Sequence, residues 1–140
     1  MKTTQIAVFG KNQPGNFGHV CRSLSDVGIN ILAVSITSDV DSGIMRLVTN
    51  DNTRAKQALE RAGFSFSESE VLVIEQEDEV GRGAQLGETL AAAGVNIEQA
   101  YASACGAVCS CGKFIIVLKV DNIDKAVDAL GKSAFVDFDS

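Results

Sequence analysis

The chain of 140 residues is 46% hydrophobic and 21% charged, which is typical of a soluble globular protein. Its formal net charge of −6 argues against binding to nucleic acid or to an anionic membrane, because both favour a basic protein face. No apolar run reaches the length of about 18 residues that a transmembrane helix needs. Met1 to Gln5 lead into a strand and not into a signal-peptide core, so we expect a cytoplasmic protein with reduced thiols.

The N-terminal half predicts four strands and two helices. Residues 5–9 form a short apolar run that indicates a buried strand, and Pro14-Gly15 ends it in a tight turn. Asn16 is the expected N-cap of a helix with an apolar stripe, and Gly28 is expected to end that helix. The other expected elements are strands over 29–38, 44–49 and 64–66, and a helix over 53–62.

The C-terminal half repeats the first at an offset of 66 residues. Gly15, Leu24, Gly28, Asn30 and Ile31 correspond to Gly81, Leu90, Gly94, Asn96 and Ile97. The expected elements are strands over 71–75, 95–104, 114–120 and 134–138, and helices over 84–93 and 123–130. Each half therefore has the order βαββαβ, which is the ferredoxin-like pattern. We predict an α+β fold with two tandem domains, residues 1–69 and 70–140.

The residues argue against most enzyme classes. His19 is the only histidine, and no Gly-x-Ser-x-Gly motif accompanies it, so we expect it at the rim of a helix and not as a base. The sequence lacks a phosphate-binding Gly-x-x-x-x-Gly-Lys-Ser/Thr loop. Gly81-Arg82-Gly83 lacks the third glycine of a dinucleotide site. We predict no catalytic residue and no cofactor.

Three of the four cysteines, Cys105, Cys109 and Cys111, lie close together. As thiolates they could hold a soft metal ion, which gives one hypothesis of a metal or redox module. The alternative is that small, adaptable residues fill a long hairpin, with cysteine as a small hydrophobe. We place no metal site in the sequence, and we interpret the acidic run 75–79 as a solvated loop.

The repeated glycine turns and the repeated Gly-(Ile/Val)-Asn-Ile allow two interpretations. A glycine turn that leads into a helix exposes unpaired N–H groups at the positive helix end, and these suit a carboxylate. Asn30 could then donate to and accept from the ammonium and carboxylate of a free amino acid. In the other interpretation, both motifs only connect a strand to a helix and a helix to a strand.

The segment from Asn12 to Phe17, a helix, and then Gly28-Ile29-Asn30-Ile31 resembles the ACT domain, a regulatory module that binds amino acids. The second copy, from Asp78 through Asn96-Ile97, is similar. The resemblance covers nearly the whole chain as two tandem ACT domains. It implies antiparallel sheets side by side with helices on one face, and ligands at the interface between paired domains.

By this resemblance, the turn after the first strand and the asparagine of Gly-x-Asn line the site in each copy. The implied ligand-binding residues are Asn12, Pro14, Gly15, Asn16, Phe17 and Asn30, and then Asp78, Val80, Gly81, Arg82, Gly83 and Asn96. Val80 departs from the family, which usually has proline there, and the cysteine-rich hairpin is a second departure. The first copy is therefore the better candidate for a complete site.

The sequence as a whole indicates a non-enzymatic amino-acid sensor in which a small ligand alters assembly or a partner contact. We expect a homodimer, because an unpaired edge strand favours symmetric pairing. We expect neither nucleic acid nor a membrane as a partner, and the sequence does not identify a regulated enzyme. Two alternatives are the cysteine-based metal or redox module and an interaction domain that binds no ligand.

Overall fold

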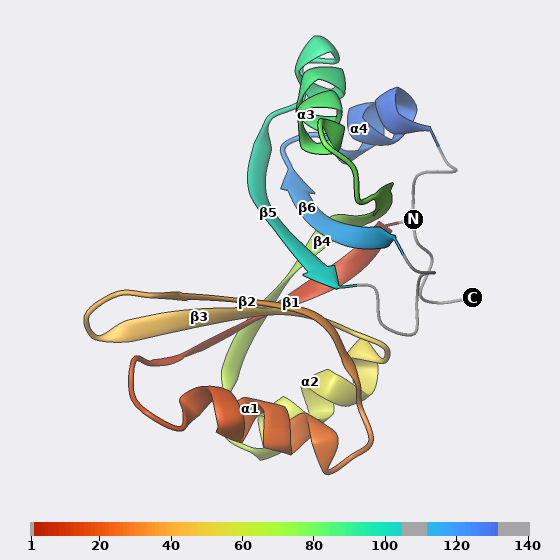
Figure 1. Ribbon diagram of the computed structural model, residues 1–140. Coiled ribbons are helices and arrows are strands. Elements are labelled where there is room, and N and C mark those ends of the chain that lie inside the picture. Colours follow the sequence, from red (N-terminus) through yellow and green to blue (C-terminus); the bar gives the residue numbers. More distant parts are fainter. Residues whose placement is uncertain (1, 105–111, 132–140) are drawn as a thin grey trace. The chain divides into compact units, whose positions relative to one another are not determined.

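The computed structural model describes residues 2–104 and 112–131, and its Cα positions group into two compact units (Figure 1). The first unit comprises residues 4–69. The second comprises the described residues from Glu70 onward together with Lys2 and Thr3.

The boundary between domains at residues 69 and 70 stays a prediction, and so does a cytoplasmic location. No helix among the described residues is long and apolar enough to cross a membrane.

The first unit contains an antiparallel sheet with two helices. Its strands are β1 (Lys2–Lys11), β2 (Ile31–Ser38), β3 (Ser42–Thr49) and the start of β4 (Ser65–Glu77), and its helices are α1 (Asn16–Ser25) and α2 (Asn52–Arg61). The strands lie in the order β2-β3-β1-β4, so that β2 is at the edge. The element order βαββαβ is the one predicted.

The core of the first unit lies between this sheet and its helices. Alternate residues of β1, Ile6 and Val8, point to the helices and are buried, because side chains alternate between the faces of a strand. Both helices contribute to the same cluster of buried side chains. The cluster comprises Ile6, Val8, Val20, Leu24, Ile29, Met45, Leu47, Ala55, Ala58 and Leu59.

The second unit follows the same element order over its described residues. Its strands lie in the order β4-β6-β5, with β5 (Ile97–Ala104) and β6 (Lys113–Val120) joined antiparallel, and its helices are α3 (Arg82–Ala92) and α4 (Ile123–Leu130). Leu72 and Ile74 of β4 and Leu86 and Leu90 of α3 belong to its core. The predicted strand 134–138 and the segment Cys105–Cys111 lie outside the described residues.

Two sequence predictions are wrong in detail. The strands expected over 64–66 and 71–75 are one continuous strand, β4, since the polar segment between them is also extended and hydrogen-bonded. Within it, Ser69 accepts a hydrogen bond from Gln5 Nε2 at 3.4 Å, and Glu68 pairs with Lys56 Nζ at 2.9 Å. Asn16 is not an N-cap: Gly15 has that position, with φ of 88°, and Asn16 is the first helical residue.

The repeat is also visible in the hydrogen bonds of the backbone. The N–H of Asn30 donates to Asn50 Oδ1 at 3.0 Å, and the N–H of Asn96 donates to Asp121 Oδ1 at 2.9 Å. In return, the carbonyl of each of these asparagines accepts from the N–H of the same partner, at 3.1 Å in both units. The Gly-x-Asn motif therefore fixes the start of β2 and of β5 in the same way.

Candidate functional site

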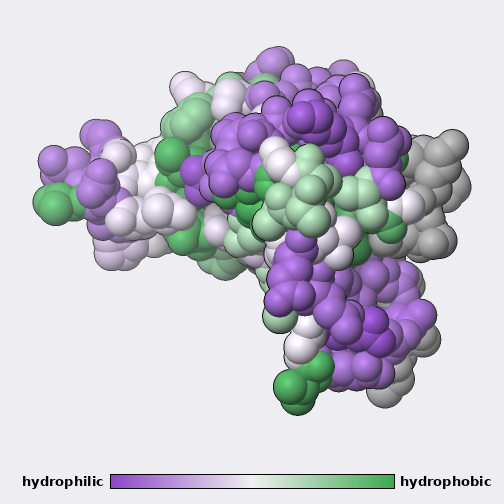
Figure 2. Space-filling model, turned by 90° about the horizontal axis from the view of Figure 1, so that it is seen from above, coloured by the Kyte–Doolittle hydropathy of each residue, from purple (hydrophilic) through white to green (hydrophobic). Residues whose placement is uncertain are grey.

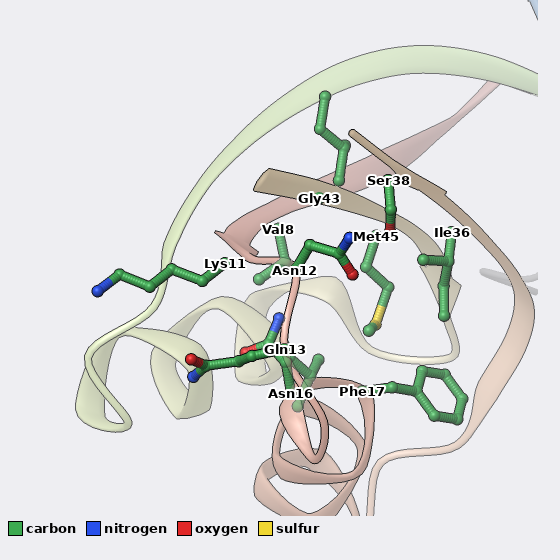
Figure 3. Close-up of a pocket in the computed structure, with 12 residues that line it drawn as sticks. Val8, Lys11, Asn12, Gln13, Asn16, Phe17, Ile36, Ser38, Gly43 and Met45 are labelled. Atoms are coloured by element: carbon green, nitrogen blue, oxygen red, sulfur yellow. The ribbon is translucent and has the colours of Figure 1, made fainter. Parts of the chain in front are cut away.

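A depression of about 180 Å³ lies in the first unit, where the turn between β1 and α1 meets the end of β2 and the start of β3 (Figure 3). The turn, the first turn of α1 and the two strands all contribute to its wall. The lining residues are Val8, Lys11, Asn12, Gln13, Asn16, Phe17, Val20, Ile36, Ser38, Gly43, Ile44 and Met45. The predicted glycine turn therefore borders a concave surface.

Strand pairing explains why these elements meet. The end of β1 pairs with the start of β3, with Lys11 opposite Ser42, and the end of β2 also pairs with the start of β3, with Ser38 opposite Gly43. Asn12 fastens the turn to the β2–β3 hairpin: its N–H donates to the carbonyl of Asp41 at 3.2 Å. The Asn12 amide nitrogen donates to the carbonyl of Asp39 at 2.7 Å.

The floor and one wall of the depression are apolar. Val8, Val20 and Met45 are buried, whereas Phe17 and Ile36 are 46% and 51% exposed although both are large hydrophobic residues. Figure 3 shows the side chains of Phe17, Ile36 and Met45 around a common space. This part of the depression therefore offers an apolar group a surface away from water.

The opposite wall consists of amides. Asn12, Gln13 and Asn16 line it, and the Asn12 amide is directed toward Met45 (Figure 3). Asn16 lies close over Gly10, where an added methyl group would be 2.5 Å from its amide nitrogen. Lys11 is the cation of this lining, but its side chain extends away from Met45 and Ile36.

The helix that begins beside the depression has no side-chain cap. Its N-cap, Gly15, is in the left-handed conformation, and no side chain accepts from the first N–H groups. By contrast, Asp51 caps α2 by accepting from the N–H of Arg54 at 3.1 Å. The first N–H groups of any helix lack intrahelical partners and lie at its positive end, which favours an anion such as a carboxylate.

The corresponding turn in the second unit has a different chemistry. Its depression, of about 280 Å³, is lined by Glu75, Gln76, Glu77, Arg82 and Lys113. Lys113 Nζ lies 3.2 Å from Glu75 Oε1 and 3.8 Å from Glu77 Oε1. The hydrogen bond to Glu75 and the charges of both glutamates raise the pKa of Lys113. The ionic groups of this lining are therefore largely engaged with one another.

Arg82 and Gln76 show how far the two turns have diverged. Arg82 stands where the first unit has Asn16, and its Nη2 pairs with Glu79 Oε2 at 3.0 Å. Gln76 stands where the first unit has Gly10, and its Oε1 is buried with no donor among the described residues. As at α1, a left-handed glycine, Gly81 with φ of 91°, precedes α3 without a side-chain cap.

The structure brings only some of the sequence-predicted site residues together. In the first copy, Asn12, Asn16 and Phe17 line the depression, and Pro14 and Gly15 belong to the adjoining turn. Asn30 does not line it, because it follows the other end of α1. In the second copy, Arg82 lines the depression, and the other five predicted residues do not: Asp78, Val80, Gly81, Gly83 and Asn96. Their ligand-binding roles stay predictions.

The strand residues of the depression were not predicted from the sequence. Ile36, Ser38 and Met45 come from β2 and β3, and no sequence motif marks them. A usable signal was present in the predicted topology, since βαββ order places the end of the first strand beside the β2–β3 hairpin. Exposed apolar residues on the edge strand, such as Ile36, would then have pointed to this place.

The described residues contain no cluster of potential metal ligands: no three or more histidine, cysteine, aspartate or glutamate side chains among them lie together. Partial burial raises the pKa of the Cys21 thiol, which makes its thiolate scarcer. His19 is exposed, and its ring contacts the edge of Phe64 with 4.9 Å between ring centroids. The hypothesis of a metal at Cys105, Cys109 and Cys111 lies outside the described residues.

Comparisons with known proteins place the chain in a family. No curated protein matches it. Protein BT0572 from Bacteroides thetaiotaomicron is 26% identical, with a TM-score of 0.89 over 99% of this chain and 94% of that one. The regulatory subunit of aspartate kinase from Thermus thermophilus, in a ligand-free form, has a TM-score of 0.64 at 17% identity and shares the fold over 93% of each chain. The family model of the ACT domain pair matches residues 1–137, and the chain therefore belongs to the ACT domain pair family.

Proposed function

We propose that the chain is a non-enzymatic regulatory module that binds a free amino acid in the depression of its first unit. ACT domains are regulatory modules rather than catalytic ones, and the family typically binds small ligands. The observation that supports the proposal most is the depression itself, which lies at the repeated glycine turn and combines an apolar wall with amides. Such a combination suits a small molecule with one apolar and one polar end.

The polar end of the ligand meets the turn. The N–H groups at the start of α1 donate to its carboxylate, since no side chain caps them and the positive helix end lies there. The side-chain oxygen of Asn12 accepts from the ammonium group, because the Asn12 amide nitrogen already donates to Asp39. Asn16 supplies a further donor and acceptor beside Gly15.

The proposal includes a homodimer in which a second copy covers the depression. Strand β2 is an edge strand and presents Val34 and Ile36, which are 37% and 51% exposed. Most of the surface visible in Figure 2 is hydrophilic, and hydrophobic residues form separate patches on it. An exposed apolar edge strand favours pairing with another strand, and a ligand at that interface would alter assembly or a partner contact.

Thermal denaturation in the presence of each of the twenty amino acids tests the proposal. A ligand at a hundred times its Kd adds about 2.7 kcal/mol to the free energy of unfolding. This raises the midpoint by several degrees, since about 1 kcal/mol is worth roughly 2–4 °C at about 150 residues. Asn16→Ala is expected to reduce the shift without loss of stability, because alanine suits a first helical turn. No shift with any amino acid would contradict the proposal.

A further inference from the structure

We propose that the site selects an amino acid with an aliphatic side chain, of the size of valine, leucine, isoleucine or methionine, and that each chain binds one such molecule. This inference rests on the proposed function and specifies its ligand. It follows from three features of the described residues: the chemistry of the inner wall, the size of the depression and the ionic character of the second depression.

The inner wall offers no partner for a charged ligand side chain. Phe17, Ile36 and Met45 surround the space that lies farthest from the turn (Figure 3). No carboxylate belongs to the lining, and the one ammonium group, of Lys11, extends away from this space. Burying an unpaired charge or an unpaired polar group is unfavourable, whereas burying methyl and methylene groups makes the free energy of binding more favourable. The wall therefore favours aliphatic over acidic, basic or amide side chains.

The size of the depression limits the ligand further. Its volume is about 180 Å³, and an apolar cavity of about 150 Å³ is enough for a benzene-sized molecule. A side chain of three or four heavy atoms fits this space while the carboxylate and ammonium remain at the turn. Pockets for drug-sized ligands are larger, at about 300–1,000 Å³. The depression therefore fits the side chain of a single small amino acid.

The second depression is unsuited to the same ligand. Glu75 and Glu77 line it, and their negative charges oppose an approaching carboxylate. The cations that could attract that carboxylate are already paired, Lys113 with both glutamates and Arg82 with Glu79. The lining described there also contains no apolar side chain to receive an aliphatic group. We therefore expect one ligand per chain and not two.

Isothermal titration calorimetry of the full chain tests this inference, with leucine, valine, isoleucine and methionine against alanine, serine, aspartate and lysine. Each buried methylene is worth about 0.8 kcal/mol, or roughly fourfold in Kd, so leucine is expected to bind tens of times more tightly than alanine. The stoichiometry is expected to be one per chain. Tighter binding of aspartate, lysine or serine than of leucine would overturn the aliphatic selectivity and leave the proposed function intact.

Two matched variants locate the ligand side chain. Ile36→Ser removes an exposed residue that lines the depression, whereas Val40→Ser removes an exposed hydrophobic residue of the turn between β2 and β3 that does not line it. We expect Ile36→Ser to weaken leucine binding about tenfold, with little change for alanine, and Val40→Ser to leave both unchanged. Equal losses in the two variants would overturn the contact with Ile36. Two leucines per chain would overturn the single site, and no binding of any amino acid would overturn this inference and the proposed function together.

Discussion

Two glycines near the start of α1 have opposite roles. Gly15 has φ of 88°, in the left-handed region, whereas Gly18 lies inside the helix, and an added methyl group would meet nothing within 4 Å at either position. We expect Gly15→Ala to destabilise the protein by about 1–2 kcal/mol, because other residues avoid that conformation. Gly18→Ala should stabilise it by about 0.5–1 kcal/mol. Urea denaturation of both variants measures these changes, and equal effects would contradict the backbone assignment.

Gly10 controls the position of Asn16. Its absent side chain leaves room for the Asn16 amide, which would be 2.5 Å from a methyl group there. We expect Gly10→Ala to displace this amide and weaken ligand binding several-fold, while the midpoint of thermal unfolding changes little because the amide is the end of a half-exposed side chain. Gly43→Ala is the comparison at the other side of the depression, where an added methyl group would be 3.3 Å from Ser38 Oγ. Unchanged affinity in Gly10→Ala would contradict a role for Asn16.

Individual residues also show what the sequence could predict. The resemblance to the ACT domain implies that the glycine turn and the Gly-x-Asn motif line one site, and both motifs recur at a fixed offset. The structure places Asn30 away from the depression, where its N–H and carbonyl hold Asn50. A repeated motif therefore indicated a repeated structure, but it did not distinguish a backbone connection from a ligand contact.

At the scale of elements, the helices fall into two kinds. Asp51 and Asn122 cap α2 and α4, each accepting at 3.1 Å from an N–H of the first turn, whereas glycine precedes α1 and α3. We expect Asp51→Ala to lower the free energy of unfolding by about 1 kcal/mol, because it leaves an N–H of the helix unpaired. Asp51→Asn is the control and should retain most of the stability. Chemical denaturation checks both, and no loss in Asp51→Ala would contradict the cap.

Strand β4 shows why element boundaries were harder to predict than the elements themselves. Its middle, with alternating serine and glutamate, has the composition of a linker, and we expected a break there. In the structure the neighbours of these side chains stabilise the extended backbone, as the pairs Gln5–Ser69 and Lys56–Glu68 show. Such contacts join residues far apart in the sequence, so local composition cannot reveal them.

For the whole molecule, hydrophobic periodicity and the repeat together predict two ferredoxin-like units of α+β class, and the resemblance of the turn motifs implies that they are ACT domains. The structure and the family match confirm both predictions. The difference between the two depressions was less predictable. Motif positions showed where each turn lies, but strand pairing determines that Ile36 and Met45 join one lining while Lys113 joins the other.

The central claim is that one amino acid binds at the turn of the first unit. Titration of the ¹⁵N-labelled chain with leucine, followed by amide chemical shifts in NMR spectra, tests it most directly. The account predicts shifts concentrated in residues 11–17 and 36–45, which saturate at one ligand per chain, with the amides around Gly81 unchanged. Unchanged spectra with every amino acid, or shifts centred on residues 75–83 alone, would contradict it.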